Sequence, residues 1–154
     1  MSRHERQAVT VRVLRMHIWA AATLIPLLVR LLSLPLLVRL LTPPRGCRPY
    51  AAVPPEQIAG LVARRLARPR NMRRRACLRQ SLVLFHFFRL AGLAAELHVG
   101  MYPPSADPAR LHGHCWVTIA GRPLPFSPQR DAAETVRFDS ARGQLSTGKV
   151  LPKS

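Results

Sequence analysis

Hydrophobic residues recur three and four positions apart through residues 8–41, which is the spacing of one face of a helix. Pro26 and Pro35 interrupt this stretch, so we expect two helices with a break near one of the two prolines. Residues 43–49 are rich in proline and form a linker. The next helix is expected to begin near Pro55, because proline suits the first helical turn and the acid that follows it suits the positive helix end.

Residues 76–91 form the most apolar helix candidate of the chain. Gly92 follows it, and glycine suits the left-handed position that ends many helices. The period then changes from about 3.6 to two, because apolar and polar residues alternate over residues 95–101. That alternation predicts a strand.

A second strand is predicted over residues 114–119, a tight turn at Ala120-Gly121 and a third strand over residues 122–126. Together these elements would form an antiparallel hairpin. Helices followed by a small antiparallel sheet indicate an α+β fold.

The same pattern predicts three regions. Residues 1–50 are an N-terminal apolar helical region, and residues 51–139 hold the core that carries the candidate chemistry. The pattern fades after about residue 128, and residues 140–154 contain few apolar positions. We therefore expect 140–154 to be a loose C-terminal tail.

Charge adds a further expectation. The chain carries 24 Lys and Arg against seven Asp and Glu, a formal net charge of +17, and residues 1–75 hold 15 arginines and two carboxylates. Such an excess predicts an acidic partner, whether nucleic acid, anionic lipid or an acidic peptide. Aromatic residues are few and no nucleic-acid-binding motif accompanies the charge, so we expect no nucleic-acid partner. The ratio of 22 arginines to two lysines also suits a GC-rich coding sequence.

Cys47, Cys77 and Cys115 are odd in number and form no CxxC pair. We therefore expect a reducing compartment and a cytoplasmic protein. The longest apolar stretch, Ile18–Val29, is shorter than the roughly 18–20 uninterrupted apolar residues that span a bilayer. It suits a buried or interfacial helix, so peripheral membrane contact is an expected alternative.

Cys77 lies at the predicted start of the helix over residues 76–91. The dipole and free N–H groups of a helix start stabilise a thiolate, and the arginines of residues 73–75 add positive potential upstream. The same N–H groups could bind the oxyanion of a tetrahedral intermediate. Cys77 is therefore a candidate nucleophile, and its alternative role is that of a small core residue.

His114 lies on a predicted strand 37 residues after Cys77. An imidazole there can accept the thiol proton and later protonate a leaving amine, although a strand histidine can also serve only to bond the backbone. Metal binding is the competing chemistry, with possible ligands at His86, His98, His112, His114 and Cys115. Adjacent strand residues face opposite sides, and the spacing of these residues matches no compact zinc motif. We therefore expect no metal and no cofactor.

Four short motifs follow one another between about residues 56 and 127. They are Cys77-Leu78-x-x-Ser81-Leu82, Gly92-Leu93-x-x-Glu96-Leu97-x-x-Gly100, Gly113-His114-Cys115-Trp116-Val117 and Gly121-Arg122-Pro123-Leu124. In this order and spacing, the segment resembles the lasso-peptide leader peptidases of the transglutaminase-like cysteine protease superfamily. The resemblance implies a transglutaminase/papain-like fold, with the Cys-bearing helix packed on a small antiparallel sheet.

The resemblance further implies a cysteine endopeptidase of bacterial antibiotic biosynthesis. Such an enzyme removes the leader from a ribosomally synthesised precursor peptide during lasso-peptide maturation, and a lasso cyclase then closes the ring. The family's leader is held by a small recognition protein, either fused or separate. Residues 1–50 read as helix rather than as its winged fold, so a separate leader-recognition protein is the implied partner.

The resemblance also implies a Cys–His–Asp triad, and this chain departs from it at the acid. The family's Asp position is Phe126 here, which cannot orient an imidazole. Asp131 restores a carboxylate but requires a shifted strand or a bulge. Ser127 and Gln129 are neutral alternatives, and Ser127 would lie opposite His114 in the predicted hairpin.

The implied catalytic set is therefore Cys77, His114 and Asp131, with the third position open. Thr118 replaces a second family carboxylate, a glutamate on the histidine strand. These changes leave two interpretations. The chain is an active leader peptidase, or it is a catalytically degenerate homologue that acts as a peptide- or partner-binding module.

Overall fold

The computed structural model describes residues 3–44, 46–67, 76–101, 113–124, 133–138 and 145–146. By its internal contacts the chain divides into two compact units, Met1–Leu93 and Ala94–Ser154. The first unit is built from helices and the second from strands, which confirms the predicted α+β class.

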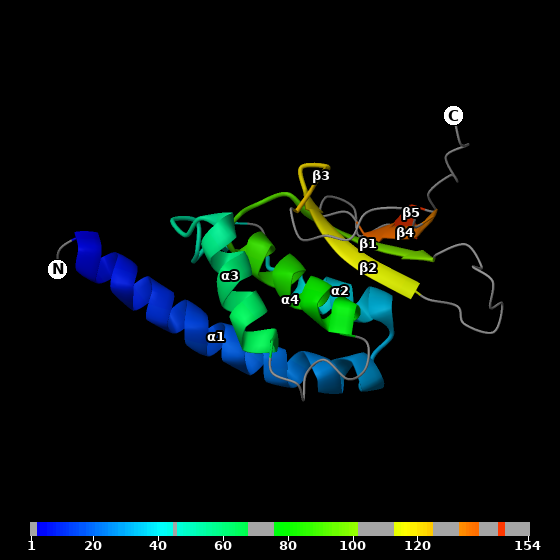
Figure 1. Ribbon diagram of the computed structural model, residues 1–154, viewed down its shortest axis with the longest axis horizontal. Helices are drawn as coiled ribbons and strands as arrows, with labels where there is room; N and C mark the ends of the chain where they lie inside the picture. Colours follow the sequence, from blue (N-terminus) through cyan, green and yellow to red (C-terminus); the bar gives the residue numbers. More distant parts are fainter. Residues whose placement is uncertain are drawn as a thin grey trace. The chain divides into compact units, whose positions relative to one another are not determined.

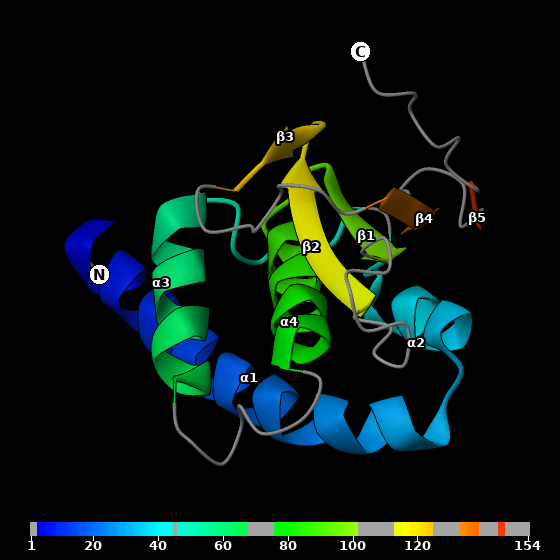
Figure 2. The same ribbon diagram turned by 45° about the vertical axis from the view of Figure 1, so that its right-hand side comes forward.

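Within the described residues the helical unit holds α1 (Arg3–Leu31), α2 (Leu34–Leu41), α3 (Pro55–Leu66) and α4 (Ala76–Leu90). Both α3 and α4 contact α1, and they lie on the same side of it in Figures 1 and 2. The first two helices are therefore packed with the helix that carries Cys77.

The helix α1 runs unbroken through Pro26, and the break falls just before Pro35, which occupies the first turn of α2. The expected break near Pro35 is confirmed, and the alternative at Pro26 is wrong. Proline inside a helix costs about 3 kcal/mol. Burial of the adjacent Ile25, which is 1% exposed, helps to offset that cost.

By length and composition alone, Gln7–Leu31 of α1 could cross a bilayer, with a mean hydropathy of 1.4. This finding corrects the expectation that no stretch is apolar enough. That expectation counted uninterrupted runs, whereas the helix continues through Pro26 and an isolated arginine. A core helix of a soluble protein and a signal sequence pass the same test, and α1 buries Leu14 and Ile18 against protein.

The core of the helical unit is centred on α4, which the other three helices all contact. Phe85, Phe87 and Phe88 of α4 are at most 1% exposed. Burial of each such side chain stabilises the fold by about 2–3 kcal/mol. The helix predicted over residues 76–91 is therefore confirmed, and this core fixes the position of α4. The expectation that it is the most apolar helix is wrong, because Arg39 is the only polar side chain among the eight residues of α2.

Gly92 ends α4 with a φ of +80°, as predicted. The N–H of Leu93 donates to the carbonyl of Phe88, and the N–H of Gly92 donates to that of Arg89, both at 2.9 Å. These two bonds form a Schellman motif. The positive φ favours glycine here, and a Cβ at Gly92 would also lie 2.7 Å from the Cδ of Arg48, so the exposed Arg48 side chain would have to move.

Within the described residues the sheet unit has five antiparallel strands in the order β3-β2-β1-β4-β5. They are β1 (Ala95–Met101), β2 (Gly113–Ile119), β3 (Arg122–Pro123), β4 (Ala133–Phe138) and β5 (Leu145–Ser146). Figure 2 shows β1 and β2 side by side at the centre of the sheet.

The hairpin of β2 and β3 is confirmed. Ala120 and Gly121 both have positive φ, 50° and 74°, as a two-residue type I′ turn requires. The described part of the third strand, however, is only Arg122–Pro123.

Both β4 and β5 were missed by the sequence-based reading, and β5 lies inside the expected loose tail. The partner of β4 is distant in the sequence, because β4 pairs with β1 across more than 30 residues, and β5 is a two-residue strand paired with β4. A local period carries little information about such pairing.

Candidate active site

The register of β1 and β2 gives the sheet two faces of different character. Glu96 is paired with Thr118, and His98 with Trp116. Because strand side chains alternate between faces, these four residues and His114 share one face. The opposite face is apolar, with Ala95, Leu97, Cys115, Val117 and Phe138 all buried. The candidate base thus lies on the polar face, and Cys115 faces away from it as expected.

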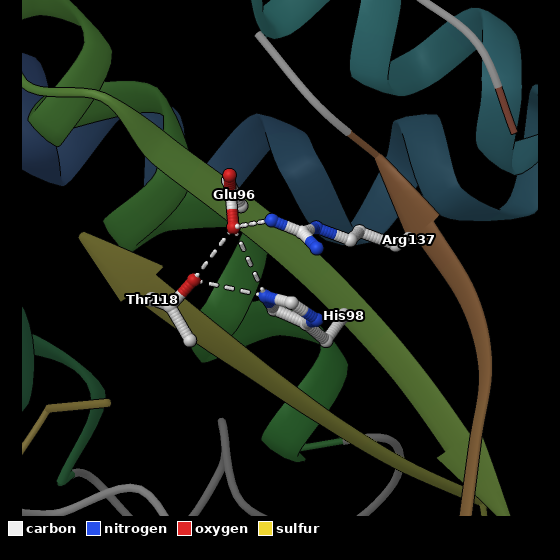
Figure 3. A network of polar contacts seen from close by, with 4 residues as sticks. All are labelled: Glu96, His98, Thr118 and Arg137. Atoms are coloured by element: carbon white, nitrogen blue, oxygen red, sulfur yellow. Dashed lines mark hydrogen bonds and ion pairs between the residues drawn. The ribbon is translucent and has the colours of Figure 1, made fainter. Parts of the chain in front are cut away.

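A directed chain of hydrogen bonds crosses this face (Figure 3). The Thr118 hydroxyl donates to Oε2 of Glu96 at 3.1 Å, so it accepts from Nε2–H of His98 at 2.9 Å. Arg137 on β4 donates to the same carboxylate oxygen at 2.6 Å. His98 Nε2 is also 3.6 Å from Glu96 Oε2. These contacts fix the tautomer and the orientation of the His98 ring.

The rings on the same face are stacked. His98 lies against Trp116 with ring centroids 5.3 Å apart and planes 7° from parallel. His114 also stacks with Trp116, at 6.1 Å and 20°. The indole is 8% exposed. Trp116 therefore stacks with both histidines. One of them, His98, is itself held in place by hydrogen bonds.

Cys77 is the second residue of α4 and is partly buried. The first turn of α4 contains no acid, and Arg79 lies in it. A helix start without carboxylates favours an anion. The chain's other two thiols differ in exposure, since Cys47 is exposed and Cys115 is buried.

The candidate site residues are distributed over the chain as follows. Cys77 belongs to the helical unit and His114 to the sheet unit. Asp131, together with Phe126, Ser127 and Gln129, lies outside the described residues.

The sequence-based reading did not connect Glu96, His98 and Arg137. It treated Glu96 as part of a motif and overlooked its link to His98. The available signal was the i, i+2 spacing of Glu96 and His98, which places both on one face of a strand. Pairing them with Thr118 and Arg137 requires the register with β2 and β4, which local sequence does not supply.

One comparison with known proteins gives a match. Residues 19–138 match the family model described as the transglutaminase-like superfamily, which is 120 of the 154 residues. The matched segment includes Cys77 and His114. It also includes the four hydrogen-bonded residues of the sheet, Glu96, His98, Thr118 and Arg137. The chain belongs to the transglutaminase-like superfamily. Neither the curated proteins nor the solved structures that were compared include a match.

Membership confirms the superfamily level of the resemblance seen in the sequence. The transglutaminase-like superfamily includes cysteine proteases and transglutaminases, and both use acyl transfer through a thiol. The match begins inside α1, so the second half of that helix belongs to the superfamily domain.

A second histidine pair lies in the helical unit of this superfamily member. His17 Nδ1 shares a hydrogen bond with the Tyr50 hydroxyl at 3.0 Å, and Nδ1–H of His86 donates to the carbonyl of Leu41 at 2.7 Å. The two imidazoles are 5.5 Å apart, and both meet Phe87 edge-on. Burial lowers the pKa of both histidines and raises that of Tyr50.

The helical unit also contains a cavity of about 270 Å³ beside the end of α4. Cys47, Arg48 and Arg89 are among the residues that line it, and neither Cys77 nor His114 does. The cavity is therefore separate from the candidate chemistry. Among the described residues, no three His, Cys, Asp or Glu side chains are grouped as ligands for a metal ion.

Proposed function

We propose that this superfamily member is a cysteine endopeptidase that removes the leader from a ribosomally synthesised precursor peptide. The order of motifs around Cys77 and His114 supports the assignment to lasso-peptide maturation. The proposed partners are the precursor, a separate leader-recognition protein and a lasso cyclase, and the proposed compartment is the cytoplasm. The observation that carries the proposal is His114, stacked on the polar face of the sheet in a transglutaminase-like chain.

Cys77 is the proposed nucleophile. Its thiolate attacks the scissile carbonyl, and a C–S bond forms while the carbonyl oxygen takes the negative charge. Backbone N–H groups at the start of α4 are suited to bind that oxyanion. Collapse of the intermediate breaks the C–N bond and leaves an acyl-enzyme on Cys77.

His114 is the proposed general acid and base. Its imidazole receives the thiol proton and returns it to the leaving amine as the C–N bond breaks. It then takes a proton from water as the water attacks the thioester. The C–S bond breaks, His114 returns the proton to the sulfur, and the carboxylic acid product and the free thiol are released. The net reaction consumes one water molecule and needs no cofactor.

The orientation of His114 is the feature in which the chain departs from the family. With Phe126 at the family's acid position, Asp131 remains a candidate third residue. The stack on Trp116 supports a second means of orientation, because a ring held against a fixed indole loses rotational freedom. Trp116 and His98 are positioning residues in this proposal, and they act through His114.

A binding module without turnover is the second candidate function. The observation that supports it is the loss of two family carboxylates, since Phe126 and Thr118 occupy the positions where the family has Asp and Glu. Glu96, which belongs to the motifs shared with the family, is directly opposite Thr118 and accepts its hydrogen bond. One carboxylate is therefore kept on the face that carries His114, which supports the active enzyme over the degenerate homologue.

Cleavage of a cognate precursor, followed by mass spectrometry in the presence of the recognition protein, tests the proposal. We expect Cys77→Ala and His114→Ala each to lower the rate by at least about 10³-fold. Cys47→Ala, a thiol removed from an exposed position, is the matched control and should retain full activity. Normal cleavage by Cys77→Ala would refute the peptidase, and binding without cleavage by the unmodified protein would establish the module.

A further inference from the structure

The helix α1 is apolar on two opposite faces. Its inner face is buried, with Leu14, Ile18 and Ile25 at most 2% exposed. Its outer face carries a second apolar row, here called the outer stripe. The outer stripe consists of Val9, Val13, Met16, Leu24, Leu27 and Leu31, which are between 49% and 74% exposed.

The outer stripe is a single continuous row rather than scattered residues. Its members are three or four positions apart, and Ala20 continues the spacing between Met16 and Leu24. At 3.6 residues per turn they occupy a narrow sector opposite the buried face, over a length of about 33 Å. The exposed fractions of its members, from 49% to 74%, show that the described neighbouring helices leave this sector uncovered. A contiguous exposed apolar row of this kind marks an interaction surface.

Charged residues beside the outer stripe identify its partner. Arg12 and Arg30 are exposed and flank the stripe along one edge, and Arg15 lies on the same side of the helix. Within α1 the only acid is Glu5, in the first turn. The following helix repeats the pattern, since Leu36 and Leu40 are exposed beside exposed Arg39. An apolar row edged by arginines, with almost no acids, is complementary to an apolar layer beneath anionic head groups.

Trp19 supports the same partner. Its indole is 57% exposed and lies on the arginine side of the stripe, with the guanidinium of Arg65 5.7 Å from the ring centroid. Tryptophan is enriched where an apolar layer meets water, because one part of its ring is apolar and the N–H needs a polar partner. Arginine can likewise lay its stem on the apolar layer and keep its charge among phosphates.

We propose that the outer stripe of α1 docks the protein on the surface of a membrane that contains anionic lipid. The helix lies in the interface with its inner face still packed on the helical unit. Spanning would instead strip Leu14, Ile18 and Ile25 from the core. The net charge of +17 attracts the protein to an acidic surface before the stripe inserts. This inference does not depend on catalysis by Cys77.

Co-sedimentation of the full chain with vesicles tests the proposal, using phosphatidylcholine alone and phosphatidylcholine mixed with phosphatidylserine at about 0.15 M salt. We expect binding to the mixed vesicles and at least tenfold weaker binding to the neutral ones. Met16→Gln combined with Leu27→Gln should weaken binding at least tenfold. Both side chains are exposed, so circular dichroism should show unchanged folding.

Paired arginine variants provide the matched control for charge. Arg12→Gln with Arg30→Gln should weaken vesicle binding at least fivefold. Arg48→Gln with Arg122→Gln removes the same charge from exposed positions outside α1 and should weaken it less than twofold. The fluorescence of Trp19, isolated by difference from Trp19→Phe, should shift to the blue on binding.

Several results would overturn the proposal. They are failure to bind the mixed vesicles, equal binding by the stripe variants, and equal effects of the two arginine pairs. Protein that stays in the membrane after alkaline carbonate washing would show a spanning helix instead. A dimer in light scattering that the stripe variants abolish, without vesicle binding, would show that a second copy covers the stripe.

Discussion

The two histidine pairs of this chain have different surroundings. In the helical unit, His17 and His86 are surrounded by Tyr50, Phe87 and the carbonyl of Leu41. In the sheet unit, His98 and His114 stack with Trp116, and His98 is linked through Thr118 to the Glu96 carboxylate.

The difference shows how neighbours decide the role of an imidazole. Burial without a carboxylate disfavours the charged ring, which is why the pKa of His17 and His86 is lowered. Those two rings suit a structural role in the neutral form. The sheet pair has a hydrogen-bonded carboxylate and a fixed stacking partner within one face, which suits an imidazole that must exchange protons in a defined orientation.

Among the changes around His98 and His114, removing the Trp116 indole is expected to have the largest effect on stability. Trp116→Ala should lower the free energy of unfolding by about 3–5 kcal/mol, because a buried ring is lost together with both stacking contacts. Trp19→Ala, at the chain's other tryptophan, removes an exposed ring and should cost less than about 1 kcal/mol. Urea denaturation measures both, and equal costs would show that the stack contributes little.

Removing the carboxylate charge should have a smaller effect. Glu96→Gln retains the shape of the side chain but loses its charge-assisted bond to Arg137, at an expected cost of about 1–3 kcal/mol. Glu56→Gln in the first turn of α3 is the control, since its exposed side chain loses only the interaction with the helix dipole, and it should cost less than Glu96→Gln, about 0.3–1 kcal/mol. A neutral result for Glu96→Gln in urea denaturation would show that the sheet pair does not depend on the carboxylate.

The smallest effect is expected from the helical pair and depends on pH. Because the folded pKa of His86 lies below its usual 6.5, the unfolded chain binds the proton more readily. The stability that this group contributes is present above about pH 6.5 and is lost as the pH falls through the lowered pKa. His86→Gln keeps a donor for Leu41 but has no ring that can be protonated. It should therefore lose less stability than the original protein between pH 7 and pH 5 in thermal melts. An identical loss would assign the pH dependence to other groups.

The elements that the sequence predicted well are those specified locally. The apolar spacing of residues 76–91, followed by Gly92, defines α4 and its Schellman end within one stretch of chain. The turn at Ala120-Gly121 likewise fixes the β2–β3 hairpin from adjacent residues. Cys77 was a visible candidate for the same reason, since its place at a helix start is a local property.

What the sequence did not reveal depends on distant partners. β4 is a short strand whose place is set by pairing with β1, with a bulge between Val99 and Gly100. The link from Glu96 to Thr118 and Arg137 needs two strand registers at once. The sequence left open whether the helix breaks at Pro26 or at Pro35, and burial on the inner face keeps α1 continuous through Pro26.

Thiol alkylation tests the central claim most directly, that Cys77 and His114 act as one catalytic pair. The rate at each cysteine is measured by mass spectrometry from pH 5 to pH 9, with exposed Cys47 and buried Cys115 as internal references. We predict that Cys77 reacts faster than Cys47 at pH 6 and that His114→Ala removes this difference. If Cys77 follows Cys47 at every pH and is indifferent to His114→Ala, the catalytic pair does not exist and the chain is a binding module.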